Sequence, residues 1–147
     1  MAVIFELADY PINDAALRFG APEPEAGAVV CFEGRVRNHH DGKKVVSLCY
    51  SVYPELAFNE GNAIAEEARE RFGLIEVFVV HRYGELVIGD LALWVRVTAV
   101  HRGEAFDACR YIIDEIKQRL PVWKDERYVD GSRAWVYSQD HNAGGSV

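Results

Sequence analysis

Two lysines, Lys117 and Lys124, are the side chains of this sequence best suited to chemistry, and they lie on either side of Pro121. A lysine amine acts as a base or nucleophile only if burial or neighbouring cations lower its pKa well below about 10.4. Lys117 borders an apolar helical stripe, and Lys124 and Arg119 are close to it in sequence, so both influences are available. The alternative is that Lys117 only complements the dipole of a last helical turn.

Two groups of cationic residues are candidate anion sites. Arg35, Val36 and Arg37 end a predicted strand and open a polar loop with two histidines, which is either an anion cradle or a solvated loop. His101 and Arg102 directly precede a predicted helix, whose free N–H groups and positive dipole end favour phosphate. In the alternative interpretation, His101 merely ends a strand.

Other reactive sites are not indicated. We expect His81 and Arg82 to form ion pairs with Glu85 and Asp90 across a turn. The five histidines lack metal-ligand spacing, and no Gly-rich nucleotide motif or GxSxG elbow occurs, so neither a metal nor a cofactor is predicted.

The elements around the lysines are a helix over residues 103–120 and a hairpin of strands 122–129 and 133–137. The helix shows apolar residues spaced by threes and fours, and Pro121 ends it. Earlier residues predict a helix from Pro54 to Phe72, a short helix over 12–19, loops at 20–27 and 38–44, a turn at 83–90, and strands at 3–7, 28–36, 45–53, 74–82 and 91–100.

From residue 45 onward the predicted order is strand, helix, strand, strand, helix, strand. This is the ferredoxin-like split βαβ pattern, an α+β fold with an antiparallel sheet and helices on one face. We expect one catalytic domain over residues 1–137 and a polar tail over 138–147.

The composition excludes some partners. The net charge of −7 argues against a nucleic-acid binder, so any bound anion must meet a local group of cations. No signal peptide or membrane helix is predicted, and the three cysteines form no CxxC pair, which favours reduced thiols in the cytoplasm.

The predicted helix separates two of the candidate sites. Arg102 and Lys117 are 15 residues apart, which is about 22 Å along one helix. They cannot contact one small molecule within a single chain. If both bind the same ligand, the site must be built from two chains, most simply in a symmetric dimer.

Several segments together resemble the large, catalytic subunit family of molybdopterin synthase over about residues 27–136. They are GAVVCFEGRVRNHH, YPELA, VVHRYGELVIGD, VTAVHRGEAFDACRYIIDEIKQRLPVWKDE and GSRAW. The resemblance implies an α/β hammerhead fold with a ferredoxin-like portion. It also implies a heterotetramer, in which a homodimer of this chain binds two small ubiquitin-like sulfur carriers with C-terminal Gly-Gly.

The implied reaction transfers two sulfurs from the thiocarboxylated carrier to cyclic pyranopterin monophosphate, forming the dithiolene of molybdopterin. By residue-for-residue match, Lys117 and Lys124 are the functional lysines. The implied substrate-binding set adds the loop, the anchoring pair from the second protomer, and two acidic residues, namely Arg35, Val36, Arg37, His101, Arg102, Asp125 and Glu126.

Two other functions are compatible with the pattern. FEGRVRN at a strand end loosely resembles the phosphate loop of acylphosphatases, although that loop should lead directly into a helix. A non-enzymatic ferredoxin-like ligand-binding module would need no reactive lysine and would tolerate Lys117→Arg.

Overall fold

The computed structural model describes residues 2–17 and 23–137, so the predicted tail and part of the predicted helix 12–19 lie outside the described residues. The elements are, in chain order, β1 (Ala2–Ala8), α1 (Asp14–Leu17), β2 (Ala28–Arg35), β3 (His39–His40), β4 (Lys43–Val52), α2 (Pro54–Phe72), β5 (Glu76–Arg82), β6 (Gly84–Val87), β7 (Leu91–Ala99), α3 (Arg102–Arg119), β8 (Val122–Tyr128) and β9 (Arg133–Tyr137).

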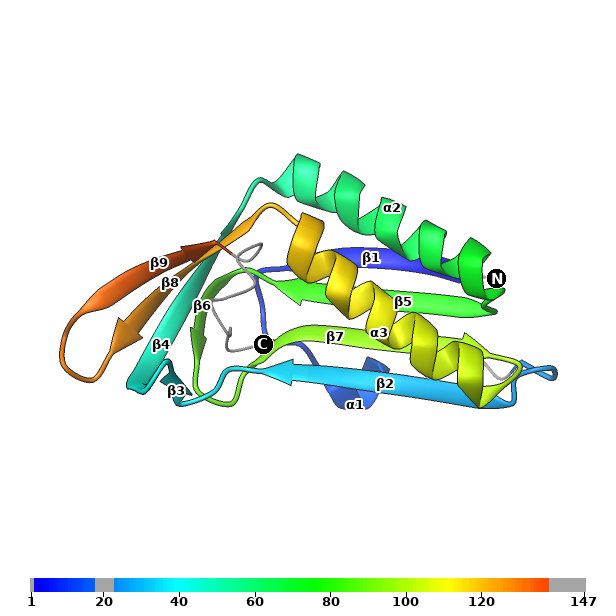
Figure 1. Ribbon diagram of the computed structural model, residues 1–147, viewed down its shortest axis with the longest axis horizontal. Helices are drawn as coiled ribbons and strands as arrows, with labels where there is room; N and C mark the ends of the chain where they lie inside the picture. Colours follow the sequence, from blue (N-terminus) through cyan, green and yellow to red (C-terminus); the bar gives the residue numbers. More distant parts are fainter. Residues whose placement is uncertain (1, 18–22, 138–147) are drawn as a thin grey trace.

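The first sheet has the strand order β1-β5-β7-β2, and both long helices cover one of its faces (Figure 1). All nine residues of β7 are buried, which agrees with its apolar side chains on both faces. The α+β class with helices on one face is therefore confirmed. The β1–β5 pair is parallel, whereas the other neighbours are antiparallel.

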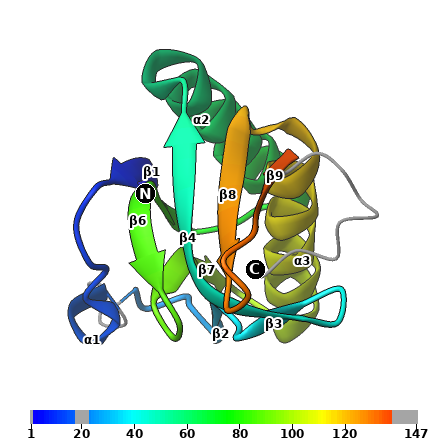
Figure 2. The ribbon, with the colours of Figure 1, turned by 90° about the vertical axis from the view of Figure 1, so that its left-hand side faces the viewer.

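The second sheet lies across one end of the first. Figure 2 looks onto it and shows β4 between β6 and β8, with β9 outside β8. The predicted split βαβ began at the strand 45–53, but β4 and β8 pair with each other in this second sheet. Strand β2 takes the place of β4 beside β7, because the pairing partner of a strand is set by tertiary packing and not by element order.

Two short strands occur where the sequence predicted only a loop and a turn. Strand β6 pairs with β4, with Leu86 opposite Leu48, and both side chains are buried. Strand β3 forms a hairpin with β4 across Asp41 and Gly42, whose φ angles are 49° and 78°. An Asp-Gly pair with two positive φ angles is the preferred two-residue hairpin turn.

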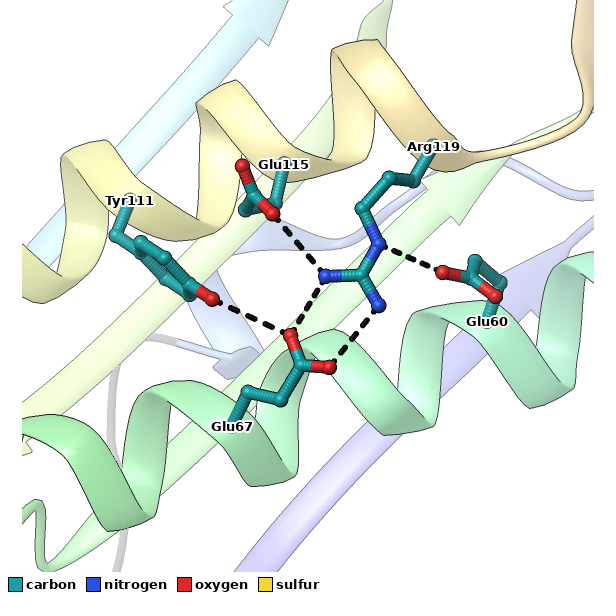
Figure 3. A network of polar contacts seen from close by, with 5 residues as sticks. All are labelled: Glu60, Glu67, Tyr111, Glu115 and Arg119. Atoms are coloured by element: carbon teal, nitrogen blue, oxygen red, sulfur yellow. Dashed lines mark hydrogen bonds and ion pairs between the residues drawn. The ribbon is translucent and has the colours of Figure 1, made fainter.

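Helix α3 is held in place by an apolar face and by one polar network. Its buried residues are Ala105, Ala108, Cys109, Ile112 and Ile116. Arg119, in its last turn, donates to Glu60 and Glu67 of α2 and to Glu115 of α3, at 2.6–3.1 Å, and the Tyr111 hydroxyl donates to Glu67 (Figure 3). No helix among the described residues is long and apolar enough to span a membrane.

Candidate functional site

The end of α3 and the start of β8 bring the two predicted lysines together. Leu120 leaves the helix in an extended conformation (φ −71°, ψ 126°) before Pro121, and β8 begins at Val122. Lys124 is only 4% exposed and lies opposite Tyr50 of β4, so it points to the inner face of the second sheet.

The Lys124 cation acts electrostatically on the amine of Lys117. The pKa of Lys117 falls from 10.5 to about 8, first because of burial and then because of the cations of Lys124 and Arg37, against a smaller opposite effect of Asp114. Burial also lowers the pKa of Lys124, with Arg37 acting in the same direction and Glu126 opposing both. Arg37 therefore belongs with Lys117 and Lys124, and the surroundings of these two amines are called the lysine site below. Arg119, expected to act on Lys117, extends to α2 instead.

Glu126 is a fully buried carboxylate beneath Lys124. Its Oε2 accepts hydrogen bonds from His40 Nδ1 at 2.8 Å and from the Tyr128 hydroxyl at 3.2 Å, and Lys124 Nζ lies 3.6 Å from Oε1. A buried charge needs such partners, because its desolvation is costly. The predicted residue Glu126 is thus in the lysine site.

His81 is a site residue that the sequence reasoning missed. Its Nδ1 donates to the Arg82 carbonyl at 2.7 Å, and its ring meets that of Tyr50 edge-on, with centroids 5.3 Å apart. Burial and the Lys117 cation lower its pKa to about 4, although the carbonyl contact opposes them. A neutral imidazole with Nδ1 protonated leaves Nε2 as an acceptor. The available signal was a histidine at the end of an apolar strand, FVVHR.

The expected ion pairs around this turn do not form. The buried Arg82 donates to the backbone carbonyl of Glu85, and the Glu85 carboxylate pairs with Arg127 at 3.3 Å. Asp90 accepts from the backbone N–H of Val87. Glu85 lies in β6, which pairs with β4, and its carboxylate contacts Arg127 of β8, so Arg82 meets only the backbone carbonyl of Glu85.

Three other predicted substrate-binding residues make contacts within the fold. Arg35 donates to the Gly89 carbonyl and to Glu33, and Val36 is buried. Asp125 points to the opposite face of β8 from Lys124, because side chains alternate along a strand, and it pairs with Arg133 of β9. Their role in substrate binding stays a prediction.

The pair His101 and Arg102 lies at the far end of α3 from the lysines. His101 is the N-cap residue, in an extended conformation (φ −127°, ψ 152°), and both side chains are exposed. A single chain therefore does not bring them to the lysine site. Within the described residues, no group of three or more His, Cys, Asp or Glu side chains could hold a metal ion.

The chain is similar to known proteins over most of its length. The family model of the MoaE protein matches residues 7–119. The molybdopterin synthase catalytic subunit from Thermoplasma volcanium is 38% identical over 88% of this chain and 95% of its own length. That from Pyrococcus abyssi is 43% identical over 78% of this chain and 77% of its own length. The crystal structure of molybdopterin synthase from Staphylococcus aureus has a TM-score of 0.82 and 35% identity, covering 90% of this chain and 96% of that one.

These relatives decide between the functions that the sequence left open. They are named as catalytic subunits, so the non-enzymatic binding module is wrong, and none of them is an acylphosphatase. The chain is an enzyme of molybdenum cofactor biosynthesis, a sulfurtransferase, and it belongs to the MoaE family of molybdopterin synthase catalytic subunits.

Proposed function

We propose that this chain transfers sulfur from the thiocarboxylated Gly-Gly terminus of a small ubiquitin-like carrier to cyclic pyranopterin monophosphate, giving the dithiolene. The observation that carries the proposal is the pair of lysines with lowered pKa values beside Arg37, of which Lys124 is buried and Lys117 partly buried. A net charge of −7 makes this local group of cations the natural place for two anions, a thiocarboxylate and a phosphate.

The lysines supply reactive groups as well as charge. With a pKa of about 8, about a tenth of Lys117 is neutral at pH 7, and a neutral amine acts as a base or nucleophile. His81 offers Nε2 as a neutral acceptor, and its ring contacts that of Tyr50. The protonated forms of Lys117 and Lys124, together with Arg37, stabilise negative charge that develops during transfer.

The substrate pocket requires a second copy of this chain. His101 and Arg102 start α3 and Lys117 lies in its last turn, so they are about 22 Å apart. We infer a symmetric homodimer in which one protomer supplies the lysines and its partner supplies the anchoring pair. Arg35, Val36, Asp125 and Glu126 complete or support the pocket. The free thiols of the three cysteines support the cytoplasmic location expected from the sequence.

The test is reconstitution with a thiocarboxylated carrier and the cyclic pterin, followed by detection of the dithiolene product. We expect Lys117→Ala to abolish product and Lys124→Ala to reduce it strongly. Lys44→Ala, at an exposed lysine of β4, is the matched control and should keep the wild-type rate. Near-wild-type turnover of Lys117→Ala would contradict the proposal.

A second experiment tests the role of the carrier's C-terminal tail in binding. Deleting its two terminal glycines should severely weaken the complex, because the carboxylate of the tail then no longer reaches the lysines. Calorimetry that showed equal affinity for the truncated carrier would remove the tail from the site.

A further inference from the structure

His40 follows Arg37 by three residues in the chain, and its side chain contacts Glu126 of the lysine site. It ends strand β3 and pairs with Lys43 across the Asp41-Gly42 turn. The turn conformation is specific to this residue pair, so the hairpin sets the position of His40 closely. The side chain is 4% exposed, although the residues around it in the sequence are exposed.

The buried imidazole has one hydrogen-bond partner within the described residues. Nδ1 forms its hydrogen bond with Glu126 Oε2 at 2.8 Å, and because a carboxylate only accepts, Nδ1 is the donor. Nε2 makes no hydrogen bond with any described residue and lies 3.5 Å from Asp41 Oδ2. The orientation of the ring therefore depends on Glu126, and the orientation of Glu126 depends on the ring.

Two hydrogen-bond donors and one nearby lysine cation surround the Glu126 carboxylate. His40 Nδ1 lies 2.8 Å from both carboxylate oxygens and donates to Oε2, which also accepts from the Tyr128 hydroxyl. Lys124 Nζ lies 3.6 Å from Oε1, outside normal hydrogen-bond distance. Glu126 has no exposed surface, so water does not compete for it. In a dry site, each donor to a carboxylate weakens the attraction that the carboxylate exerts on the others.

We propose that His40 is a positioning residue of the lysine site. Its hydrogen bond fixes the orientation of Glu126 and weakens the attraction of that carboxylate for Lys124. As a result Lys124 is not held in an exclusive ion pair and its amine stays available for reaction. The consequence for the rate rests on the proposed function. The other titratable and charged groups near this cluster come from several elements, namely Arg37, Asp41, Lys43, Tyr50, Lys117 and Tyr128.

The test compares two variants that differ in the donor alone. His40→Asn keeps an N–H donor near the position of Nδ1, and His40→Leu has the same branching without a donor. We expect His40→Leu to raise the pKa of Lys124 by about one unit, measured by titration of the lysine ¹³Cε resonance, and His40→Asn to restore it. The kcat of sulfur transfer at neutral pH should fall about tenfold, with KM within about twofold, because one unit changes the neutral fraction tenfold.

Tyr128→Phe removes the second donor to Glu126 while keeping the ring, so it tests the same idea should His40→Leu fail to fold. The Lys124 resonance should again titrate at higher pH. Superimposable Lys124 titrations in wild type and the donor-free variants would overturn the assignment. If the titration moves as expected but Lys124→Ala retains the full rate, His40 keeps its role as a positioning residue and it is the proposed role of Lys124 that fails.

Discussion

At the scale of single residues, Lys117 shows that this site costs stability. Its side chain is partly buried and close to the cations of Lys124 and Arg37, and its pKa is about 8 in the folded chain. In the unfolded chain the value is near 10.5, so between these values the unfolded state binds more protons. Stability therefore rises as pH increases from about 8 to 10.5, and the full cost of the charge remains below about 8. Functional sites that retain partly buried charged side chains commonly lower the stability of the fold.

We predict that Lys117→Met abolishes sulfur transfer and raises the free energy of unfolding at pH 7 by about 1–3 kcal/mol, because it removes a poorly solvated charge. Urea unfolding at pH 7 and at pH 10 measures both the gain and its pH dependence. The rise in stability between these pH values should shrink in Lys117→Met but persist in Lys44→Met, whose lysine is exposed. A Lys117→Met protein less stable than wild type at pH 7 would show that the amine is well accommodated.

At the scale of elements, the position of Lys117 depends on how the end of α3 is attached to α2. Arg119 lies two residues further on and contacts Glu60 and Glu67 of the neighbouring helix (Figure 3). The hydrogen bonds that Arg119 donates, first of all those to Glu67, raise its pKa, so the guanidinium is always charged. Partial exposure reduces what each ion pair contributes, yet a planar guanidinium shared by three carboxylates also fixes geometry.

We predict that Arg119→Ala lowers the free energy of unfolding by about 1–2 kcal/mol, since several partly exposed pairs are lost together and two carboxylates of α2 are left without this cation. It should also lower kcat several-fold, because the last turn of α3 carries Lys117. Thermal denaturation and steady-state kinetics measure the two effects. Arg110→Ala, at an exposed arginine of the same helix, is the control and should change neither. An Arg119→Ala enzyme with lower stability but unchanged kcat would show that α3 is positioned by its apolar face alone.

At the scale of the whole molecule, the length of α3 determines how the site is completed. The helix runs from Arg102 to Arg119, so its two functional ends lie about as far apart as the sequence predicted. One described chain therefore holds the lysines, Arg37 and Glu126 together but leaves His101 and Arg102 on the opposite end of the molecule. A two-fold axis that brings the start of one α3 near the end of the other would complete two identical pockets.

We predict that the inactive variants Lys117→Ala and Arg102→Ala complement each other when mixed under conditions of subunit exchange. In a mixed dimer, one pocket takes Lys117 from the Arg102 variant and Arg102 from the Lys117 variant and is intact, while the other carries both lesions. Random exchange makes half of the dimers mixed, so about a quarter of the wild-type activity should return. Exchange is followed independently by mass spectrometry of a tagged variant. Verified exchange without any activity would show that the two residues do not act across an interface.

Much of this arrangement was predictable because it depends on local rules. Apolar spacing and Pro121 predicted α3 and its end, so Lys117 was correctly expected on the border of a buried stripe. Gly73, at φ 63°, is the C-terminal cap expected for α2. The distance between Arg102 and Lys117 needed only the helical rise per residue. Family resemblance added the reaction and its partners, which no periodicity contains.

The tertiary structure alone decided which buried polar groups meet. Sequence order placed β4 and β8 in the ferredoxin-like sheet, but they pair in a second sheet whose inner face carries Lys124 and Glu126. His40 and Glu126 are far apart in the chain, and His81 reaches Tyr50 only because β5 ends beside β4. A lysine pKa depends on burial and on charges within a few ångströms, and those distances are set by long-range strand pairing that residue types and spacing do not specify.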